Sequence, residues 1–145
     1  MTTTQSTTTP LADALHAFVE ARNAALLRAR KALGLGDLDA RALLYIATHP
    51  DTRPGDLRGY LGITSAGVTT LTNRLIDKGA VAREIDANDR RSTTITVTAD
   101  LDSEPWIALR HFDHDLAASL ADSDPDAAAA FAELLTSAVA SLPQR

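Results

Sequence analysis

Apolar side chains recur along this chain with two different periods, and each period predicts a different kind of element. From residue 11 to residue 33 they return every three or four positions without an interior glycine or proline, which indicates one long helix. Between residues 81 and 98 apolar and polar side chains alternate instead, and many are β-branched. This alternation favours two strands joined by the charged stretch 86–92. Helical spacing also predicts helices over 38–49, 53–61, 65–79, 103–121 and 126–142.

Cap and turn residues set the expected helix boundaries. Gly62 supplies a tight turn between two of the helices, and Thr64 is expected to cap the helix that follows. Thr52 is the expected N-cap of the helix before this turn, and Ser103 that of the helix after the hairpin. The chain is therefore predicted to be mainly α, with a small β-hairpin.

The order of these elements is that of a helix-turn-helix followed by a wing. Two helices separated by a glycine turn come first, and the hairpin follows them directly. The expected fold is a winged helix-turn-helix flanked by long N-terminal and C-terminal helices. The expected regions are a disordered polar tail over 1–10, an N-terminal dimerisation helix within 11–36, the winged helix-turn-helix over 37–100 and C-terminal dimerisation helices over 101–145.

Charge divides the chain into unlike parts. Its 145 residues carry 19 acidic and 14 basic side chains, a net charge of -5. Residues 53–91 nevertheless hold seven basic and five acidic side chains, a net of +2, whereas residues 92–145 hold two basic and nine acidic ones, a net of -7. A local excess of positive charge points to an anionic partner at that place, and the alternative is an ordinary solvated surface.

Several classes of function are disfavoured by what the sequence lacks. It contains no cysteine, which excludes disulfides, thiolate nucleophiles and thiol-based redox sensing. It has no glycine-rich phosphate loop, nucleophile elbow or metalloprotease motif, so neither an enzyme nor a cofactor is expected. No apolar run approaches the length of a membrane span, and the first ten residues lack the apolar core of a signal peptide. A cytoplasmic protein without membrane contact is therefore expected.

A helix-turn-helix binds double-stranded DNA by placing its second helix in the major groove. That helix is 65–79, and its outward side chains that can contact phosphates or base edges are Ser65, Ala66, Thr69, Thr70 and Asn73. Arg74 either contacts phosphate or pairs with an acidic residue of the domain. At the hairpin tip, Arg90 and Arg91 are placed to reach the adjacent backbone or minor groove, where a narrow groove attracts arginine.

Several short motifs accompany this order of elements. They are Leu61-Gly62-Ile63-Thr64, the helix positions Val68, Leu71 and Arg74-Leu75, the segment Asp77-Lys78-Gly79, the hairpin tip Asp89-Arg90-Arg91, and Val97-Thr98. Together they resemble the MarR family of transcriptional regulators over residues 11–142. The resemblance implies that Arg91 enters the minor groove and that Arg90 touches phosphate or the groove edge. It also implies that Asp89 orients Arg91 or pairs with a nearby arginine.

Two features depart from the family's pattern. The family usually has Leu-Thr-x-x-Gly after the wing, whereas this chain has Val97-Thr98-Ala99-Asp100-Leu101, so the connection is expected to differ in shape. The family often has a longer or basic residue where Thr70 stands. A small hydroxyl there implies weaker or different base readout.

The helices outside the winged region carry more apolar surface than one small domain needs. The stripes of 11–33 and 126–142 are therefore expected to interlock two subunits of a homodimer, and the resemblance implies the same. The resemblance further implies a small-molecule effector, because the family often responds to phenolic or other lipophilic anions. The candidate pocket residues are His16, Arg22, Tyr45, His49, Trp106 and Phe112, with core packing as the alternative.

A metal site is the weakest of the candidates. His111 and His114 stand three apart on one helical face with Asp115 beside them, a spacing that can bind a metal. A complete site needs further ligands, for which His49 is a candidate, and exposed helical histidines more often have no metal. No metal is expected.

The sequence thus predicts a two-fold dimeric repressor that binds a palindromic operator and responds to a ligand. The alternative is a winged-helix module used only for protein–protein contact. Net acidity and the small side chain of Thr70 favour that alternative. The polar outer face of 65–79 and the two adjacent arginines of the hairpin tip count against it.

Overall fold

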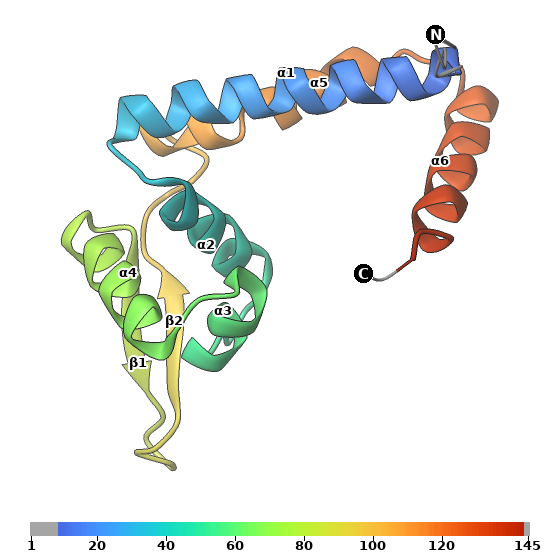
Figure 1. The fold of residues 1–145 in the computed structure, drawn as a ribbon. Coiled ribbons are helices and arrows are strands. Elements are labelled where there is room, and N and C mark those ends of the chain that lie inside the picture. The colour runs from blue at the N-terminus through green and yellow to red at the C-terminus, as the bar shows by residue number, and fades with distance from the viewer. Residues whose placement is uncertain (1–8, 144–145) are drawn as a thin grey trace, which may run out of the picture. The chain divides into compact units, whose positions relative to one another are not determined.

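Six α-helices, a short 3-10 helix and one β-hairpin make up residues 9–143, the part of the chain that the computed structural model describes (Figure 1). They are α1 (Pro10–Leu33), α2 (Asp37–Thr48), α3 (Pro54–Leu61), α4 (Ser65–Asp77), β1 (Val81–Ile85), β2 (Thr93–Val97), η1 (Trp106–Leu109), α5 (His111–Leu120) and α6 (Pro125–Ala140). The mainly helical fold with a single hairpin confirms the predicted fold class. The chain divides into two compact units, one ending at His111 and one beginning at Phe112, and each is described by itself.

α1 is the long N-terminal helix that the apolar spacing predicts. Thr9 is its N-cap, and the hydroxyl accepts a backbone hydrogen bond of 3.3 Å from the first turn. Pro10 occupies the first helical position, where its missing N–H costs nothing. Gly34 ends the helix with a φ of 63°, a left-handed conformation that glycine adopts without strain. Of the predicted tail, residues 1–8 lie outside the described residues, and the last two begin this helix.

α2, α3 and α4 form the predicted helix-turn-helix. Gly62 lies between α3 and α4 with a φ of 65°, so the turn requires the left-handed backbone for which glycine was expected. Thr64 caps α4 as predicted, because its Oγ1 accepts a hydrogen bond of 3.0 Å from the N–H of Gly67. The start of α4 is therefore held by its own sequence as well as by tertiary packing.

Thr52 is not the N-cap of α3, so that expectation was wrong. Its side chain is turned into the protein, where Thr52 is 2% exposed and its hydroxyl donates to the carbonyl of His49 at 2.6 Å. Arg53 precedes α3 instead, and its N–H donates to the carboxylate of Asp56 at 2.8 Å. The carbonyl of Thr52 accepts a hydrogen bond of 2.8 Å from the N–H of Ile95, which ties the loop before α3 to β2.

The single helix expected over 103–121 is divided into η1 and α5, and Ser103 is not its cap. The Ser103 hydroxyl instead donates to the carboxylate of Asp100 at 2.5 Å, in the turn before η1. The apolar positions Trp106, Leu109 and Phe112 are three apart, a spacing that fits a 3-10 helix as well as an α-helix. The apolar pattern alone could not reveal the break.

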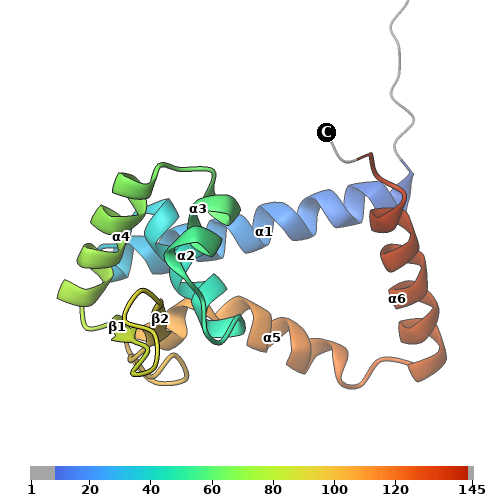
Figure 2. The ribbon, with the colours of Figure 1, turned by 90° about the horizontal axis from the view of Figure 1, so that it is seen from below.

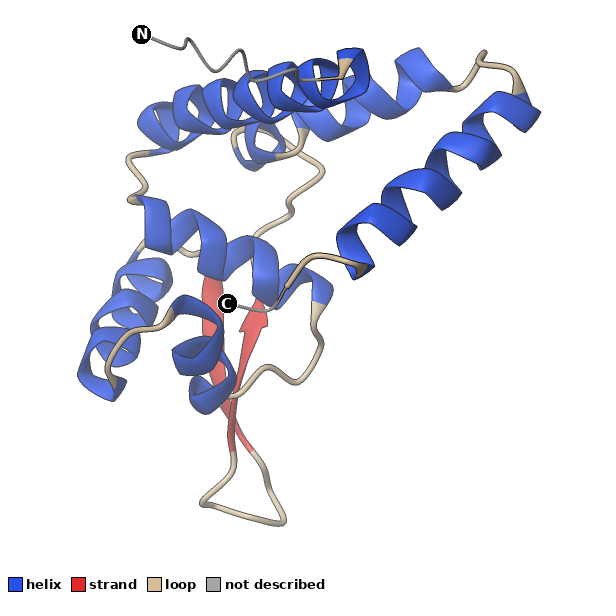
Figure 3. Cartoon of the chain, turned by 45° about the vertical axis from the view of Figure 1, so that its right-hand side comes forward, coloured by secondary structure: helices blue, strands red, loops and turns tan. Residues whose placement is uncertain are grey.

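The hairpin is anchored to the helices through one core. β1 and β2 pair antiparallel, with Val81 opposite Val97 and Ile85 opposite Thr93, and their far end extends past α2, α3 and α4 (Figure 3). The largest fully buried apolar side chains come from these three helices and from β2, and they are Leu43, Leu57, Leu71, Leu75 and Ile95. Burial of side chains of this size stabilises a fold by about 1.5–3 kcal/mol each. The base of the wing is therefore anchored in the core, whereas the side chains of its tip are exposed.

α5 and α6 contain no buried residue within the described part of the chain. The large apolar side chains exposed from Leu120 onward are Leu120, Phe131, Leu134, Val139 and Leu142, and those exposed on α1 are Leu11, Phe18, Val19 and Leu27. Extended apolar surface of this kind marks an interaction site in a folded protein. No helix among residues 9–143 is long and apolar enough to cross a membrane.

Candidate nucleic-acid interface

α4 has one buried face and one face of small polar side chains. Its helical spacing buries Val68, Leu71, Thr72 and Leu75. The exposed residues of the opposite face are Ser65, Ala66, Thr69, Thr70 and Asn73, as predicted. Figures 1 and 2 show α4 beside β1, at the edge of the helix-turn-helix, where its outer face is uncovered within the first unit. None of these side chains is large enough to keep α4 out of a major groove of about 12 Å width.

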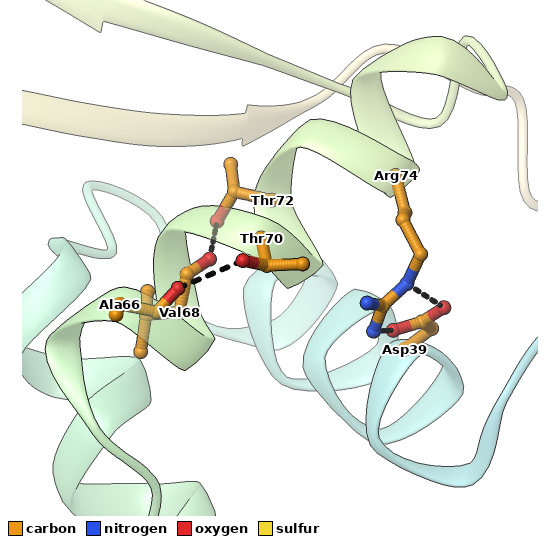
Figure 4. Close-up of polar contacts among 6 residues, drawn as sticks. All are labelled: Asp39, Ala66, Val68, Thr70, Thr72 and Arg74. Carbon is orange, nitrogen blue, oxygen red and sulfur yellow. Dashed lines mark hydrogen bonds and ion pairs between the residues drawn. The ribbon is translucent and has the colours of Figure 1, made fainter.

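The threonine hydroxyls of α4 are turned toward carbonyls of the same helix. Thr70 Oγ1 donates to the carbonyl of Ala66 at 3.0 Å, and the buried Thr72 donates to that of Val68 at 2.7 Å (Figure 4). Thr69 Oγ1 donates in the same way at 3.2 Å to the carbonyl four residues before it. Because these protons are used, Thr69 and Thr70 present oxygen lone pairs and methyl groups outward. Such a surface can accept hydrogen bonds from base amino groups and pack against a thymine methyl.

Arg74 is held by Asp39 of α2 in a bidentate ion pair. Its Nη2 lies 2.6 Å from Asp39 Oδ1, and its Nε lies 3.0 Å from Oδ2 (Figure 4). The side chain of Asp39 is 5% exposed, whereas that of Arg74 is 50% exposed. Hydrogen bonding to Asp39 raises the pKa of Arg74. The sequence left two roles open for Arg74, a phosphate contact or an internal ion pair. In the structure Arg74 makes the internal ion pair, which fixes α4 against α2.

Two aspartates build the hairpin tip. Asp86 accepts a hydrogen bond of 2.8 Å from the N–H of Asn88, and Asp89 accepts one of 3.0 Å from the N–H of Arg91. Such turns fix the backbone through a short acidic side chain. Within residues 9–143, neither Arg90 nor Arg91 takes part in an ion pair, and both are exposed. Asp89 therefore orients Arg91 through the backbone, and the hairpin ends in two free guanidinium groups.

Arg83 is a candidate that the sequence pattern does not single out. It lies on β1, and its Nη2 donates to Oδ1 of Asn73 at 2.8 Å and to the carbonyl of Thr69 at 3.5 Å. The wing is thus connected to the exposed face of α4 by a side chain. The only signal in the sequence was a cation between Val81 and Ile85, on the side of the strand where apolar residues were expected.

Another cation, Arg58, stands beside the N-terminal half of α4. A hollow of about 340 Å³ between α3 and α4 is lined by Pro54, Gly55, Arg58, Ser65, Val68 and Thr69. Arg58 is exposed and takes part in no ion pair among the described residues. Its charge therefore adds to the positive potential around the N-terminal half of α4.

Comparison with protein-family models shows which known family this region resembles. Residues 33–92 match the model of the MarR family, from the end of α1 to the end of the hairpin tip. Over these residues, which include the helix-turn-helix and the hairpin tip, the chain is similar to the MarR family. Proteins of this family are transcriptional regulators. A comparison with curated proteins finds no match.

Solved structures share the MarR-like fold across most of the chain. A variant of MepR from S. aureus bound to an oligodeoxyribonucleotide is 17% identical, with a TM-score of 0.60 over 94% of this chain and 100% of that chain. YusO from Bacillus subtilis is 17% identical, with a TM-score of 0.63 over 91% of this chain and 94% of that one. S. aureus MepR bound to ethidium bromide is 16% identical, with a TM-score of 0.65 over 91% of this chain and 96% of that one. At these identities the likeness shows the fold.

The effector pocket expected from the MarR resemblance involves residues that the structure places in different surroundings. Tyr45 stacks on His49, with ring centroids 4.0 Å apart, and on Tyr60, with centroids 4.3 Å apart. Trp106 is half-buried and packs against the core of the first unit. Core packing, the alternative interpretation, therefore holds for Trp106.

The other candidate pocket residues lie on α1 and α5. His16 is exposed and Arg22 is half-buried on α1, and Phe112 belongs to the second unit. The six residues are not brought together within one unit, so the MarR-type effector pocket stays a prediction.

The histidine candidates for a metal site lie on α5. His111, His114 and Asp115 are all exposed. Among residues 9–143, no group of three or more histidine, cysteine, aspartate or glutamate side chains is arranged to hold a metal ion.

Proposed function

We propose that this chain is a transcriptional regulator that binds double-stranded DNA, with α4 in the major groove and the hairpin tip against the adjacent minor groove. One observation carries the proposal: a helix face of small polar side chains lies beside a hairpin that ends in two unpaired arginines. Protein–protein interfaces concentrate aromatic and other large side chains at their centre, and this face has none. The alternative of a protein-contact module is therefore disfavoured.

Each candidate residue has a role in this arrangement. Thr69, Thr70 and Asn73 face base edges, while Ser65 and Ala66 approach a phosphate at the N-terminus of α4, where free backbone N–H groups favour anions. Arg91 enters the minor groove and Arg90 contacts a phosphate. Arg74 acts through Asp39 by holding α4 in place. Support comes from the shared fold of a MepR variant whose structure contains an oligodeoxyribonucleotide.

The functional unit in this proposal is a two-fold dimer on a palindromic operator. Paired recognition helices read two half-sites about one helical turn apart, so operator symmetry follows protein symmetry. The exposed apolar residues of α1 and α6 supply the surface that two subunits would bury. A dimer also doubles the number of wing arginines on the DNA.

The test is binding to the DNA upstream of the protein's own gene, measured by fluorescence anisotropy across a salt series. Wild type is expected to bind with an affinity that falls steeply as salt rises. The variant Arg91→Ala is expected to bind more weakly. Arg90→Ala, which removes the proposed phosphate contact, is expected to reduce the log–log salt slope by about 0.9, or about 1.8 per dimer. Arg28→Ala, at an exposed position of α1, is the charge-matched control.

The outcomes separate the parts of the proposal. Absence of salt-dependent binding by wild type would reject the DNA-binding function. Equal binding by wild type and Arg91→Ala would leave that function standing and remove the role given to the wing. A similar loss in Arg28→Ala would show that net charge alone matters.

Regulation in this proposal is repression released by a ligand. The ligand would favour dimer geometries in which the two α4 helices no longer match the half-site spacing. Support comes from the shared fold of MepR, which is known in complex with ethidium bromide. Run-off transcription from the same promoter tests the direction, since a repressor lowers the transcript and a phenolic anion would restore it. A transcript unchanged by the protein would contradict repression.

A further inference from the structure

Arg83 contacts one end of the Asn73 amide on the outer face of α4. Asn73 is exposed on the outer face of α4, and its Oδ1 accepts a hydrogen bond of 2.8 Å from Nη2 of Arg83. The same nitrogen lies 3.5 Å from the carbonyl of Thr69, one helical turn earlier. Arg83 itself comes from β1, whose base is fixed by the core through Val81. The guanidinium is therefore held beside Asn73 by a strand that packs independently of that contact.

The orientation of the Asn73 amide follows from the chemistry of its partner. A guanidinium has only N–H donors and no acceptor, so the atom of Asn73 that faces it must be the amide oxygen. One of the two lone pairs of the oxygen is taken by Arg83, whereas both donors of the amide nitrogen are unused among the described residues. The nitrogen offers two donors and no acceptor.

This orientation limits the bases that Asn73 can read. Recognition of adenine by asparagine is bidentate: the oxygen accepts from N6 and the nitrogen donates to N7. The edge of guanine carries two acceptors, N7 and O6, to which a donor group alone can bind. We propose that Arg83 is a positioning residue that makes Asn73 select guanine against adenine in each half-site. This inference rests on the proposed DNA-binding function.

The experiment is selection of bound sequences from a pool of random DNA duplexes, with wild type and three variants. Asn73→Ala identifies the base pair concerned, because the preference at that pair disappears. Arg83→Met keeps the apolar stem but removes the donors, so adenine is expected to gain on guanine there by about tenfold. Arg58→Ala is the control, since it removes the same charge from the same face without touching Asn73. It should weaken binding and leave the preference unchanged.

A second measurement tests the contact without DNA. The side-chain amide resonances of Asn73, identified by their disappearance in Asn73→Ala, are expected to shift in Arg83→Met and to stay in place in Arg58→Ala. The same spectra report whether each variant is folded.

The outcomes distinguish this inference from the proposed function. If wild type selects no sequence and binds no DNA, the proposed function fails. If wild type selects a sequence but Asn73→Ala or Arg83→Met selects the same one, DNA binding stands and the role of Arg83 is overturned. Unshifted Asn73 resonances in Arg83→Met would also overturn it.

Discussion

At the scale of single residues, the ion pair between Arg74 and Asp39 has two unequal partners. The Asp39 carboxylate is almost completely buried, and half of the Arg74 side chain reaches water. Removal of the arginine leaves a charge without a partner in the interior, whereas removal of the aspartate leaves a cation that water can solvate. Removing Arg74 should therefore lower the free energy of unfolding more than removing Asp39.

We expect Arg74→Ala to lower the free energy of unfolding by about 2 kcal/mol, less than the roughly 3–5 kcal/mol of a fully buried pair because Arg74 is half exposed. Asp39→Ala should cost less, and adding it to Arg74→Ala should restore part of the stability. Urea denaturation of the two single variants and the double variant measures the coupling. Arg58→Ala, which breaks no ion pair, is the control. Additive effects in the double variant would contradict this account.

Helical spacing predicted which residues of α4 face outward, but it could not predict which side chains of other elements they contact. The exposed positions Thr69, Thr70 and Asn73 follow from the apolar residues between them. Asp39 lies 35 residues before Arg74, and Arg83 reaches Asn73 from a different element. Both contacts depend on how the elements pack, which a periodic pattern in one segment does not contain.

At the scale of elements, the sequence predicted a helix cap correctly where the capping side chain points outward and bonds within its own turn. Thr64 and Gly62 act within their own turn, so sequence alone was sufficient to assign them. Thr52 has the same capping chemistry as Thr64, but a bond from β2 to its carbonyl holds it inside the fold. The cap assignment failed there because a tertiary contact took precedence over a local one.

The turn before η1 gives a prediction about pH. Hydrogen bonds from the Ser103 hydroxyl and from the N–H of Asp102 lower the pKa of Asp100. The folded pKa then lies below the unfolded one, so the stabilisation is complete above about pH 4 and is lost as pH falls through the folded pKa. Asp100→Asn should therefore be less stable than wild type at pH 7, with a difference that shrinks below about pH 4.

Thermal denaturation of wild type and Asp100→Asn from pH 7 to pH 3 measures this. Ser103→Ala is the companion variant, because it removes the largest cause of the lowered pKa while keeping the carboxylate. It should show the same convergence in weaker form. A difference that grows on acidification would have the wrong sign for a lowered pKa.

At the scale of the whole molecule, α1 and α6 both expose large apolar side chains that the described residues of the chain do not cover. Phe131 is 44% exposed and Leu134 is 53% exposed on α6, and Val19 on α1 is 47% exposed. The sequence pattern indicated this surplus, since both stripes are apolar over most of their length. It could not show which residues of the two stripes meet in the proposed dimer, because that depends on how two subunits pack.

We expect wild type to sediment as a dimer at micromolar concentration and Phe131→Asp with Leu134→Asp to sediment as a monomer. Two carboxylates within a buried apolar contact would lose their hydration without gaining partners, and a stable interface needs about 1,200–2,000 Å² of buried surface. Glu133→Gln lies between them on α6 and should remain dimeric. The monomeric variant should also bind a palindromic duplex more weakly than wild type while keeping its affinity for a single half-site. Since α4 and the wing tip are intact in that variant, equal loss on both duplexes would mean that the α6 substitutions damage the DNA-binding unit itself.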